Sequence, residues 1–139
     1  MKRSMLSSKG VIRVRLLLDT AILIWAIEAP ERLTQRAAAA LKNTDNTLDI
    51  SAVSLTEIAI KVATGKLKLS AANTRQALDD LDIRILSYTA DYAFLLFDLP
   101  LYHRDPFDRQ IIAQALAEKI PVVTADEKFS LYKGLKIIW

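Results

Sequence analysis

Acidic residues follow the apolar runs of this sequence at places where the strands of a sheet would end. Asp19 comes directly after a run of leucines, and Asp126 closely follows a valine-rich run. We expect Glu57 in the first turn of a helix after another strand, and Asp108 at the start of the helix that precedes the valine-rich run. Parallel strands end at one edge of a sheet, where such folds carry their binding sites. The four side chains could therefore converge.

Carboxylates that converge in one place repel one another and raise one another's pKa. A bound divalent cation removes this repulsion, and a site made of oxygen ligands alone suits hard ions such as Mg²⁺ or Mn²⁺. Such a site can activate a water molecule and neutralise a phosphate group. The pattern is therefore compatible with the hydrolysis of a phosphodiester bond.

Each of these acids also has a simpler interpretation as a helix cap. Asp19, Asp108 and Asp126 all stand where a helix could begin, and a negative charge there is favoured by the helix dipole. The segment from Ser54 to Glu57 fits a capping box, in which the glutamate reaches back to the backbone N–H of the serine. Caps on separate helices need not converge, whereas metal ligands must. The residues alone leave both interpretations open.

The scarce residue types narrow the choice of chemistry. The chain has 139 residues with no cysteine, one histidine and three widely separated glycines. This composition excludes disulfides, thiolate metal sites, cysteine nucleophiles and sites of several histidines within one chain. It also excludes the glycine-rich loops that bind nucleotide phosphates. The net charge of +3 permits a nucleic-acid partner without requiring one.

Apolar runs alternate with amphipathic segments along the whole chain. The expected strands are 13–18, 48–51, 83–87, 121–124 and 135–138, and the expected helices are 20–29, 31–43, 54–64, 70–81, 89–97, 108–119 and 127–132. This order predicts one α/β domain with a mostly parallel sheet of four to five strands. We expect residues 1–12 to be an N-terminal tail or extension and residues 13–139 to form the domain. We find no signal-peptide core and no run of about 20 apolar residues, so we expect a cytoplasmic protein without membrane contact.

Four motifs in this order resemble those of the PIN-domain ribonucleases, and most closely the VapC-like toxins of toxin–antitoxin pairs. The motifs are LLLDT (16–20), SAVSLTEIAIK (51–61), HRDPFDRQIIAQA (103–115) and VVTADEKF (122–129). The resemblance extends over about residues 15–139, and its specificity comes from the four motifs appearing together. It implies a three-layer α/β/α fold around the parallel sheet.

The resemblance also implies a metal site with one acid from each motif. The matching positions, for catalysis and for binding Mg²⁺ or Mn²⁺, are Asp19, Glu57, Asp108 and Asp126. The third motif offers Asp105 as well. We choose Asp108 because an apolar helix follows it, as in the family pattern, and we expect Asp105 to shape the turn or to lie in an outer layer. Thr20 and Thr124 match hydroxyl positions that could orient a carboxylate or a water molecule.

The activity implied by the resemblance is metal-dependent cleavage of RNA by a growth-inhibiting toxin. The implied partners are an RNA substrate, a cognate protein antitoxin and a second copy of the chain in a homodimer. Two alternatives stay open: an RNA-processing nuclease of the same fold that is not a toxin, and an inactive binding module. Phosphoryl-accepting receivers and haloacid-dehalogenase phosphatases fit less well, because Thr20 and Ala21 stand where those families carry an acid.

Other charged residues near the motifs have open roles. His103 could contact an RNA phosphate, although a single loop histidine is more often only solvated or hydrogen-bonded. Arg109 could pair with a carboxylate or a phosphate, or lie on a helix surface. Lys61, Lys66 and Lys68 form a basic stretch that could guide RNA, or simply a solvated helix end.

Overall fold

A computed structural model describes residues 14–139 of the chain, so the expected tail over 1–12 and Arg13 of the first strand lie outside the described residues. Helices and strands alternate as the sequence predicts. The elements are β1 (Val14–Leu18), α1 (Thr20–Glu28), η1 (Pro30–Arg32), α2 (Gln35–Lys42), β2 (Asn46–Ser51), α3 (Ala52–Ala63), α4 (Ala71–Asp80), β3 (Ile83–Leu86), α5 (Ala90–Leu95), α6 (Pro106–Glu118), β4 (Val122–Val123), η2 (Glu127–Leu131) and β5 (Ile137–Ile138).

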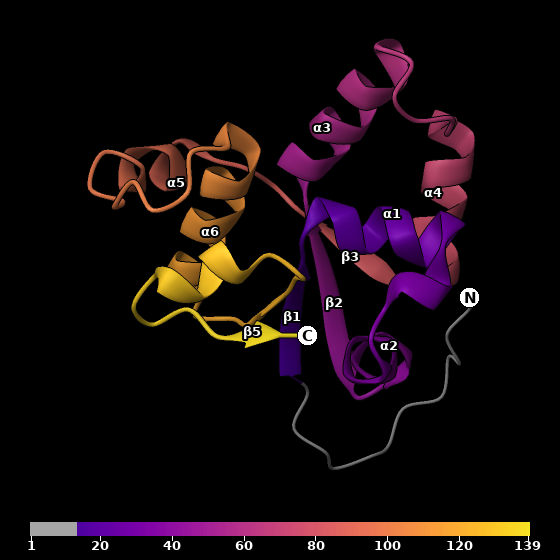
Figure 1. Cartoon of the computed structure of the whole chain (residues 1–139), viewed down its shortest axis with the longest axis horizontal. Helices are drawn as coiled ribbons and strands as arrows, with labels where there is room; N and C mark the ends of the chain where they lie inside the picture. The colour runs from indigo at the N-terminus through magenta and orange to yellow at the C-terminus, as the bar shows by residue number, and fades with distance from the viewer. Residues whose placement is uncertain (1–13) are drawn as a thin grey trace.

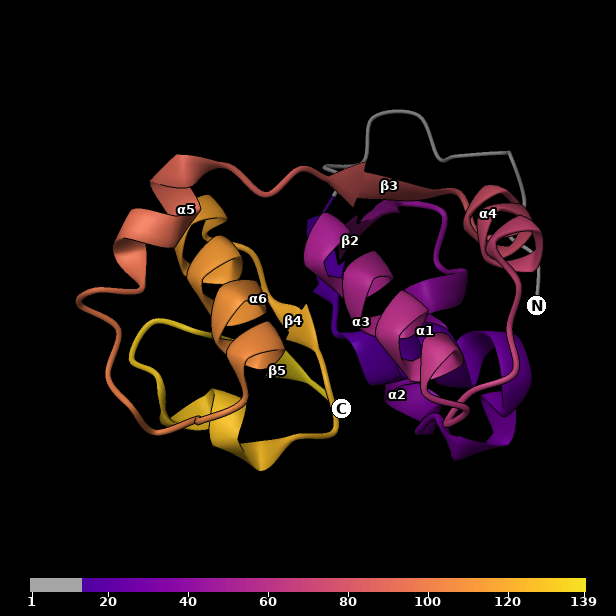
Figure 2. The same ribbon diagram turned by 90° about the horizontal axis from the view of Figure 1, so that it is seen from above.

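The β-strands pair into one five-stranded sheet with the order β3-β2-β1-β4-β5, and each pairing is parallel. Helices cover both faces, which gives the three-layer α/β/α arrangement that the sequence predicted. In Figure 1, α1 to α4 lie on one side of the central strands, and α5 and α6 lie on the other. Figure 2 shows the same two groups from above, with the strands between them.

The apolar run of β1 is continuous because helices pack against both of its faces. Leu16 and Leu18 join one core with residues of α1, α2, α3 and α4. Leu17 points the opposite way and joins a second core with Ile111 and Ile112 of α6. All three leucines are fully or almost fully buried, so this strand fixes both helical layers relative to the sheet.

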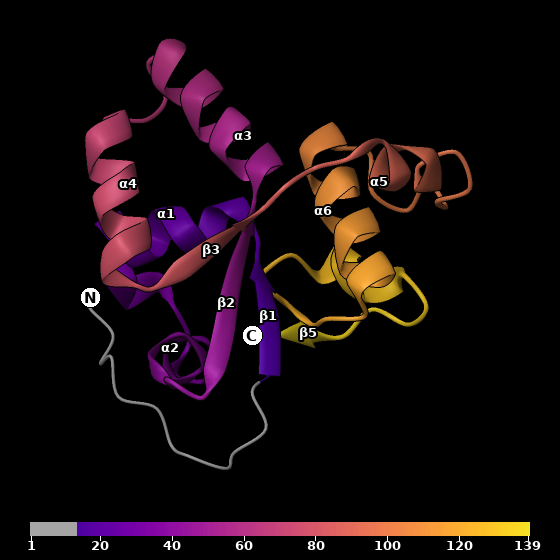
Figure 3. The same cartoon turned by 180° about the vertical axis from the view of Figure 1, so that it is seen from behind.

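The order of the strands places a change of direction between β1 and β4. From β1 the chain adds β2 and β3 on one side, and then it returns to add β4 and β5 on the other. Figure 3, the view from behind, shows β3 in front of the central strands on the way from α4 to α5. Leu18 pairs with Val123 in the register, and the N–H of Asp19 donates to the carbonyl oxygen of Val123 at 3.1 Å. Asp19 and the residues after Val123 therefore meet at the point where doubly wound sheets form their clefts.

Helix boundaries depart from the sequence expectations where capping side chains decide them. The helix expected over 31–43 is divided into η1 and α2, because Thr34 accepts the N–H of Ala37 and starts a new helix. Thr89 is the N-cap of α5, as expected, but its side chain makes no capping hydrogen bond. No helix within residues 14–139 is both long enough and apolar enough to cross a bilayer.

A buried carboxylate joins three neighbouring strands by ion pairs. Asp49 of β2 is 1% exposed, and its Oδ2 accepts a hydrogen bond from Nη2 of Arg15 on β1 at 2.8 Å. Its Oδ1 accepts from Nε of Arg84 on β3 at 2.9 Å. Arg15 also donates to Glu118 at the end of α6, at 3.1 Å. A charge in this position is tolerated because both of its oxygens are paired.

Replacing Asp49 by alanine should destabilise the fold, because the variant leaves two guanidinium groups without their carboxylate and a gap in the sheet. We expect the free energy of unfolding to fall by about 2 to 4 kcal/mol in denaturant titrations. The matched control is Asp79→Ala on the exposed side of α4, which should change stability by less than about 0.5 kcal/mol. Equal stability of the two variants would contradict the role given to Asp49.

Candidate functional site

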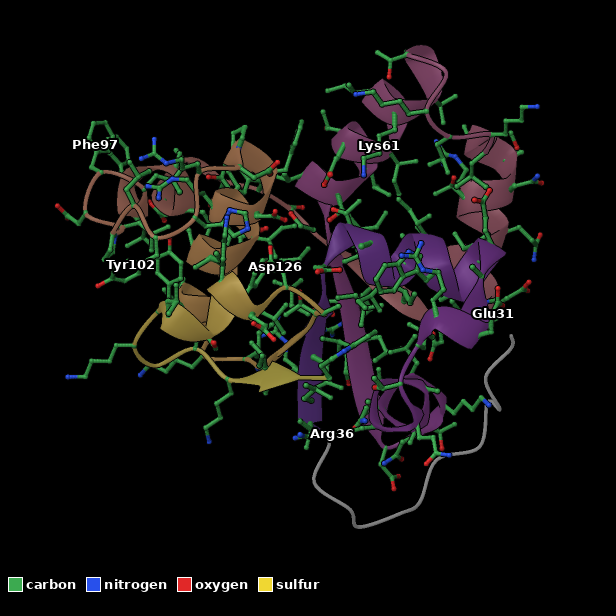
Figure 4. The ribbon with its side chains drawn as sticks, in the orientation of Figure 1. Glu31, Arg36, Lys61, Phe97, Tyr102 and Asp126 are labelled. Atoms are coloured by element: carbon green, nitrogen blue, oxygen red, sulfur yellow. The ribbon has the colours of Figure 1, made fainter. Side chains whose placement is uncertain are left out.

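A cavity of about 340 Å³ opens at the carboxyl ends of β1 and β4, and the four predicted acids all line it. The lining residues are Asp19, Thr20, Ala21, Trp25, Glu57, Lys61, Asp108, Ala125 and Asp126. Figure 4 shows Lys61 on α3, above the ends of the central strands, and Asp126 on the side where α6 lies. A larger groove of about 450 Å³ lies along α3 and α4, but its walls are mainly apolar and contain none of these acids.

Asp19 is buried at the N-terminus of α1 and accepts two hydrogen bonds. Its Oδ1 accepts the N–H of Ile22 at 2.9 Å, and its Oδ2 accepts the hydroxyl of Thr124 at 2.5 Å. Burial raises the pKa of Asp19 to about 6 from an ordinary value of 3.8. The charges of Asp126 and Glu57 contribute to this rise in pKa, while the two hydrogen bonds oppose it. The side chain of Asp19 thus caps α1 and also lines the cavity.

Glu57 reaches the cavity from the second turn of α3. This helix begins at Ala52 with Ser51 as its N-cap. The capping box predicted for Ser54 and Glu57 is therefore wrong, because the helix starts before both residues. Oε1 of Glu57 is buried without a hydrogen-bond partner, and Oε2 lies 3.4 Å from Nζ of Lys61. A buried carboxylate oxygen without a donor is costly, so this atom is suited to a positively charged partner within the cavity.

Asp108 is the third residue of α6, which begins two residues earlier than expected, at Pro106. Asp105 is the N-cap of this helix, and its Oδ1 accepts two backbone N–H groups at 2.9 Å each. Asp105 therefore shapes the turn, as expected, and Asp108 lines the cavity. Burial raises the pKa of Asp108 to about 7; the charge of Asp105 raises it further, and His103 opposes the rise.

Asp126 caps the short helix η2 and contacts the single histidine of the chain. Its Oδ1 accepts the N–H of Lys128 at 3.0 Å. Its Oδ2 lies 2.7 Å from Nε2 of His103, and the same nitrogen lies 3.2 Å from Oδ2 of Asp108. His103 is 6% exposed, so its expected solvated or phosphate-binding role gives way to a buried contact with two of the acids. The sequence signal for this contact is only its position within the third motif.

Thr20 and Arg109, whose roles the sequence left open, both make contacts within the protein. The hydroxyl of Thr20 donates to Oγ of Ser54 at 2.8 Å, which ties α1 to α3 rather than orienting an acid. Arg109 donates to carbonyl oxygens of the loop over 99–103 at 3.0 to 3.2 Å. Its guanidinium therefore fixes the loop before α6 and pairs with no carboxylate among the hydrogen bonds of the described residues.

A family model of the PIN domain matches residues 16–135, which is most of the chain. The chain belongs to the PIN-domain family. The expected family is therefore confirmed, together with the α/β architecture that it implies. None of the curated proteins compared with the chain matches it.

Solved structures share the fold of this PIN domain at low sequence identity. A chain of VapBC2 from Rickettsia felis, bound to a DNA fragment from its promoter, has a TM-score of 0.65 and 22% identity, over 89% of this chain and 97% of that one. VapBC-5 from Mycobacterium tuberculosis has a TM-score of 0.56 and 22% identity, over 90% and 98% of the two chains. FitAcB from Neisseria gonorrhoeae has a TM-score of 0.55 and 20% identity, over 88% and 95%. At these identities the likeness concerns the fold.

The cavity of this PIN domain has the donor set of a divalent-cation site. Its acids offer oxygen ligands only, which suits Mg²⁺ or Mn²⁺. Oε1 of Glu57 lacks a partner, and the pKa values of Asp19 and Asp108 are raised partly by neighbouring negative charge. In the described residues His103, Asp108 and Asp126 also present ligand atoms within 4.8 Å of one another. A cation between the four acids would relieve both the unpaired oxygen of Glu57 and the repulsion among the carboxylates.

The raised pKa of Asp19 predicts that the metal-free PIN domain loses stability as the pH rises. The folded state holds this proton up to about pH 6, whereas the unfolded chain releases it near pH 3.8. Proton binding therefore stabilises the folded state at pH 5, and this stabilisation is lost as the pH rises through 6 towards 8. We expect a loss on the order of 1 kcal/mol between pH 5 and pH 8, relative to Asp19→Asn, which does not titrate. Denaturant unfolding in EDTA at both pH values measures it. Parallel curves for the two proteins would refute the prediction.

Proposed function

We propose that this protein is a metal-dependent endoribonuclease and the toxin of a toxin–antitoxin pair. The observation that carries the proposal is the convergence of four acids from four separate segments on one cavity, together with the unpaired buried oxygen of Glu57. Helix capping accounts for Asp19 and Asp126 but not for Glu57 and Asp108, so it does not explain why all four acids line one cavity. The four acids, Asp19, Glu57, Asp108 and Asp126, are the proposed ligands of Mg²⁺ or Mn²⁺ and the proposed catalytic residues.

The cation would supply charge neutralisation at the scissile phosphate and a more acidic bound water. The chain's own residues have distinct parts. Asp19 would be a firmly held ligand, because a backbone N–H and the hydroxyl of Thr124 each contact one of its oxygens. Glu57 has an oxygen free to bind, and Lys61 beside it adds positive charge to the cavity wall. That charge would favour the approach of a phosphate backbone.

We infer the substrate and the partner from the family and the similar structures, and not from the geometry of the cavity. RNA is the substrate class implied by the resemblance of the four motifs to PIN-domain ribonucleases, and the net charge of +3 is compatible with it. The similar structures include VapBC from Salmonella typhimurium bound to DNA and a toxin–antitoxin complex from Klebsiella pneumoniae. A protein antitoxin that binds and inhibits the chain is therefore the proposed partner. The expected homodimer stays a prediction that the mass of the purified chain in solution can check.

Cleavage of a mixed-sequence RNA should require both a divalent cation and the cavity acids. We expect Mg²⁺ or Mn²⁺ to support cleavage, EDTA to abolish it, and Asp19→Asn or Glu57→Gln to reduce the rate by about 100-fold or more. The matched control is Glu127→Gln, since Glu127 is exposed, lies next to Asp126 and does not line the cavity. This variant should cleave at the wild-type rate.

Cleavage that survives EDTA, or that is equal in wild type and Asp19→Asn, would sink the nuclease proposal. If single-stranded DNA is cut and RNA is not, the substrate class is wrong while the metal site stands. If the protein binds Mn²⁺ and RNA without cutting, the inactive binding module becomes the better description.

Expression of the chain alone in a bacterial host should slow growth if the nuclease is a toxin. We expect growth to recover when the proposed cognate antitoxin is co-expressed, and we expect Asp19→Asn to leave growth unaffected. Optical density after induction measures both effects. An active nuclease with no effect on growth would instead favour the RNA-processing alternative.

A further inference from the structure

His103 lies behind the wall of the acidic cavity rather than in it. Its Nε2 is 2.7 Å from Oδ2 of Asp126 and 3.2 Å from Oδ2 of Asp108, yet His103 is not among the residues that line the cavity. It therefore contacts two proposed ligands without itself lining the cavity. Such a contact can orient a ligand without touching the metal.

The backbone determines which ring nitrogen of His103 carries the proton. The N–H of Asp105 donates to Nδ1 at 3.2 Å, so Nδ1 is the acceptor. In the neutral ring the proton must then be on Nε2, which faces the two carboxylates. This N–H donates to Asp126 at the shorter distance. The lone pair that a metal would need is therefore occupied on both nitrogens, one by the N–H of Asp105 and the other by its own proton.

The ring and the loop of His103 are held from several sides. The ring packs edge-on against Phe129, with centroids 5.7 Å apart. Its backbone N–H donates to the hydroxyl of Tyr132 at 2.9 Å, and Arg109 donates to its carbonyl oxygen at 3.2 Å. A side chain fixed in this way presents its Nε2–H in one direction.

Asp126 needs such a partner more than the other acids do. It lies at the start of a short 3₁₀ helix, and its side chain is 36% exposed, compared with 14% for Glu57 and 24% for Asp108. A single backbone N–H holds its Oδ1. Without His103, nothing in the hydrogen bonds of the described residues would fix Oδ2.

We propose that His103 is a positioning residue that holds Asp126 in the geometry required to bind the cation, by donating its Nε2–H to Oδ2. This inference rests on the proposed function, since it assumes that Asp126 is a metal ligand. It assigns a role to the single histidine that is neither metal binding nor phosphate contact.

The test is the affinity of the full chain for Mn²⁺, measured by titration calorimetry at constant pH. His103→Gln places an amide N–H near the position of Nε2 and should bind Mn²⁺ within about 3-fold of wild type. His103→Asn replaces the acceptor at Nδ1 but is too short to reach Asp126, and its affinity should fall by about 10-fold or more. In an Asp126→Ala background, His103→Asn should add less than about 2-fold, because the two residues act through one contact.

Asp49→Ala is the control for a merely structural role. It removes a buried ion pair and should lower stability, but Asp49 neither lines the cavity nor contacts His103. We expect Mn²⁺ binding close to that of wild type even where the unfolding temperature falls. If Asp49→Ala weakens binding as much as His103→Asn does, the effect comes from lower stability and the inference is overturned.

A measurement on the wild-type chain does not depend on any variant folding. Because His103 is the single histidine, its ring ¹⁵N signals need no assignment by mutagenesis. We expect Nε2 to stay protonated and Nδ1 to stay unprotonated when Mg²⁺ is added. Loss of the Nε2 proton on adding Mg²⁺ would make His103 a ligand and overturn the inference. Failure of wild type to bind Mn²⁺ at all would count against the proposed function instead.

Discussion

The structure depends on one electrostatic constraint: acidic side chains are brought together in a partly buried cavity. Burial and mutual repulsion raise the pKa of Asp19 to about 6 and that of Asp108 to about 7. The surrounding protein offsets part of this cost with fixed donors, namely backbone N–H groups at two helix starts and the hydroxyl of Thr124. The remaining cost is the unpaired oxygen of Glu57, which a cation can relieve.

Capping and function are not competing explanations for these acids. Asp19 and Asp126 each cap the helix that follows a strand, and each also lines the cavity. The N-terminus of a helix supplies N–H groups that hold a carboxylate at a fixed angle, and a parallel sheet brings several such termini to one edge. The same local geometry therefore stabilises the helix and orients a ligand. Glu57 and Asp108 reach the cavity without a capping role, from positions within α3 and α6.

The sequence predicts the parts of this structure that depend on patterns along the chain. The apolar run from Leu16 to Leu18 predicts a strand buried on both faces. Because Asp19 follows this run directly, the sequence also places Asp19 at the carboxyl end of the strand. The exact residue at which a helix starts is harder to predict from the sequence. For example, α3 begins at Ala52, because Ser51, and not Ser54, accepts the capping N–H. Two serines with the same local signal cannot be distinguished before the packing of the first turn is known. A resemblance to known motifs supplies the choice of Asp108 over Asp105.

Contacts between distant segments could not be predicted in this way. His103 is 23 positions from Asp126 and meets it only because the loop before α6 folds back onto η2. Asp49 looks like a polar interruption of a strand until Arg15 and Arg84 are placed on the strands beside it. In both cases the contact depends on how distant segments are arranged in the fold. The pattern of residues around one position does not determine that arrangement.

The position of β1 at the middle of the sheet has a consequence for how the chain acquires its site during synthesis. Asp19 and Glu57 belong to the first half of the chain, whereas the other two acids belong to the second half. Asp19 and Thr124 are 105 positions apart, and their contact closes only after β4 has paired with β1. A nascent chain that ends before β4 thus lacks the hydroxyl that contacts Oδ2 of Asp19, as well as Asp126. The complete cavity can therefore form only after the segment over Asp126 has been translated.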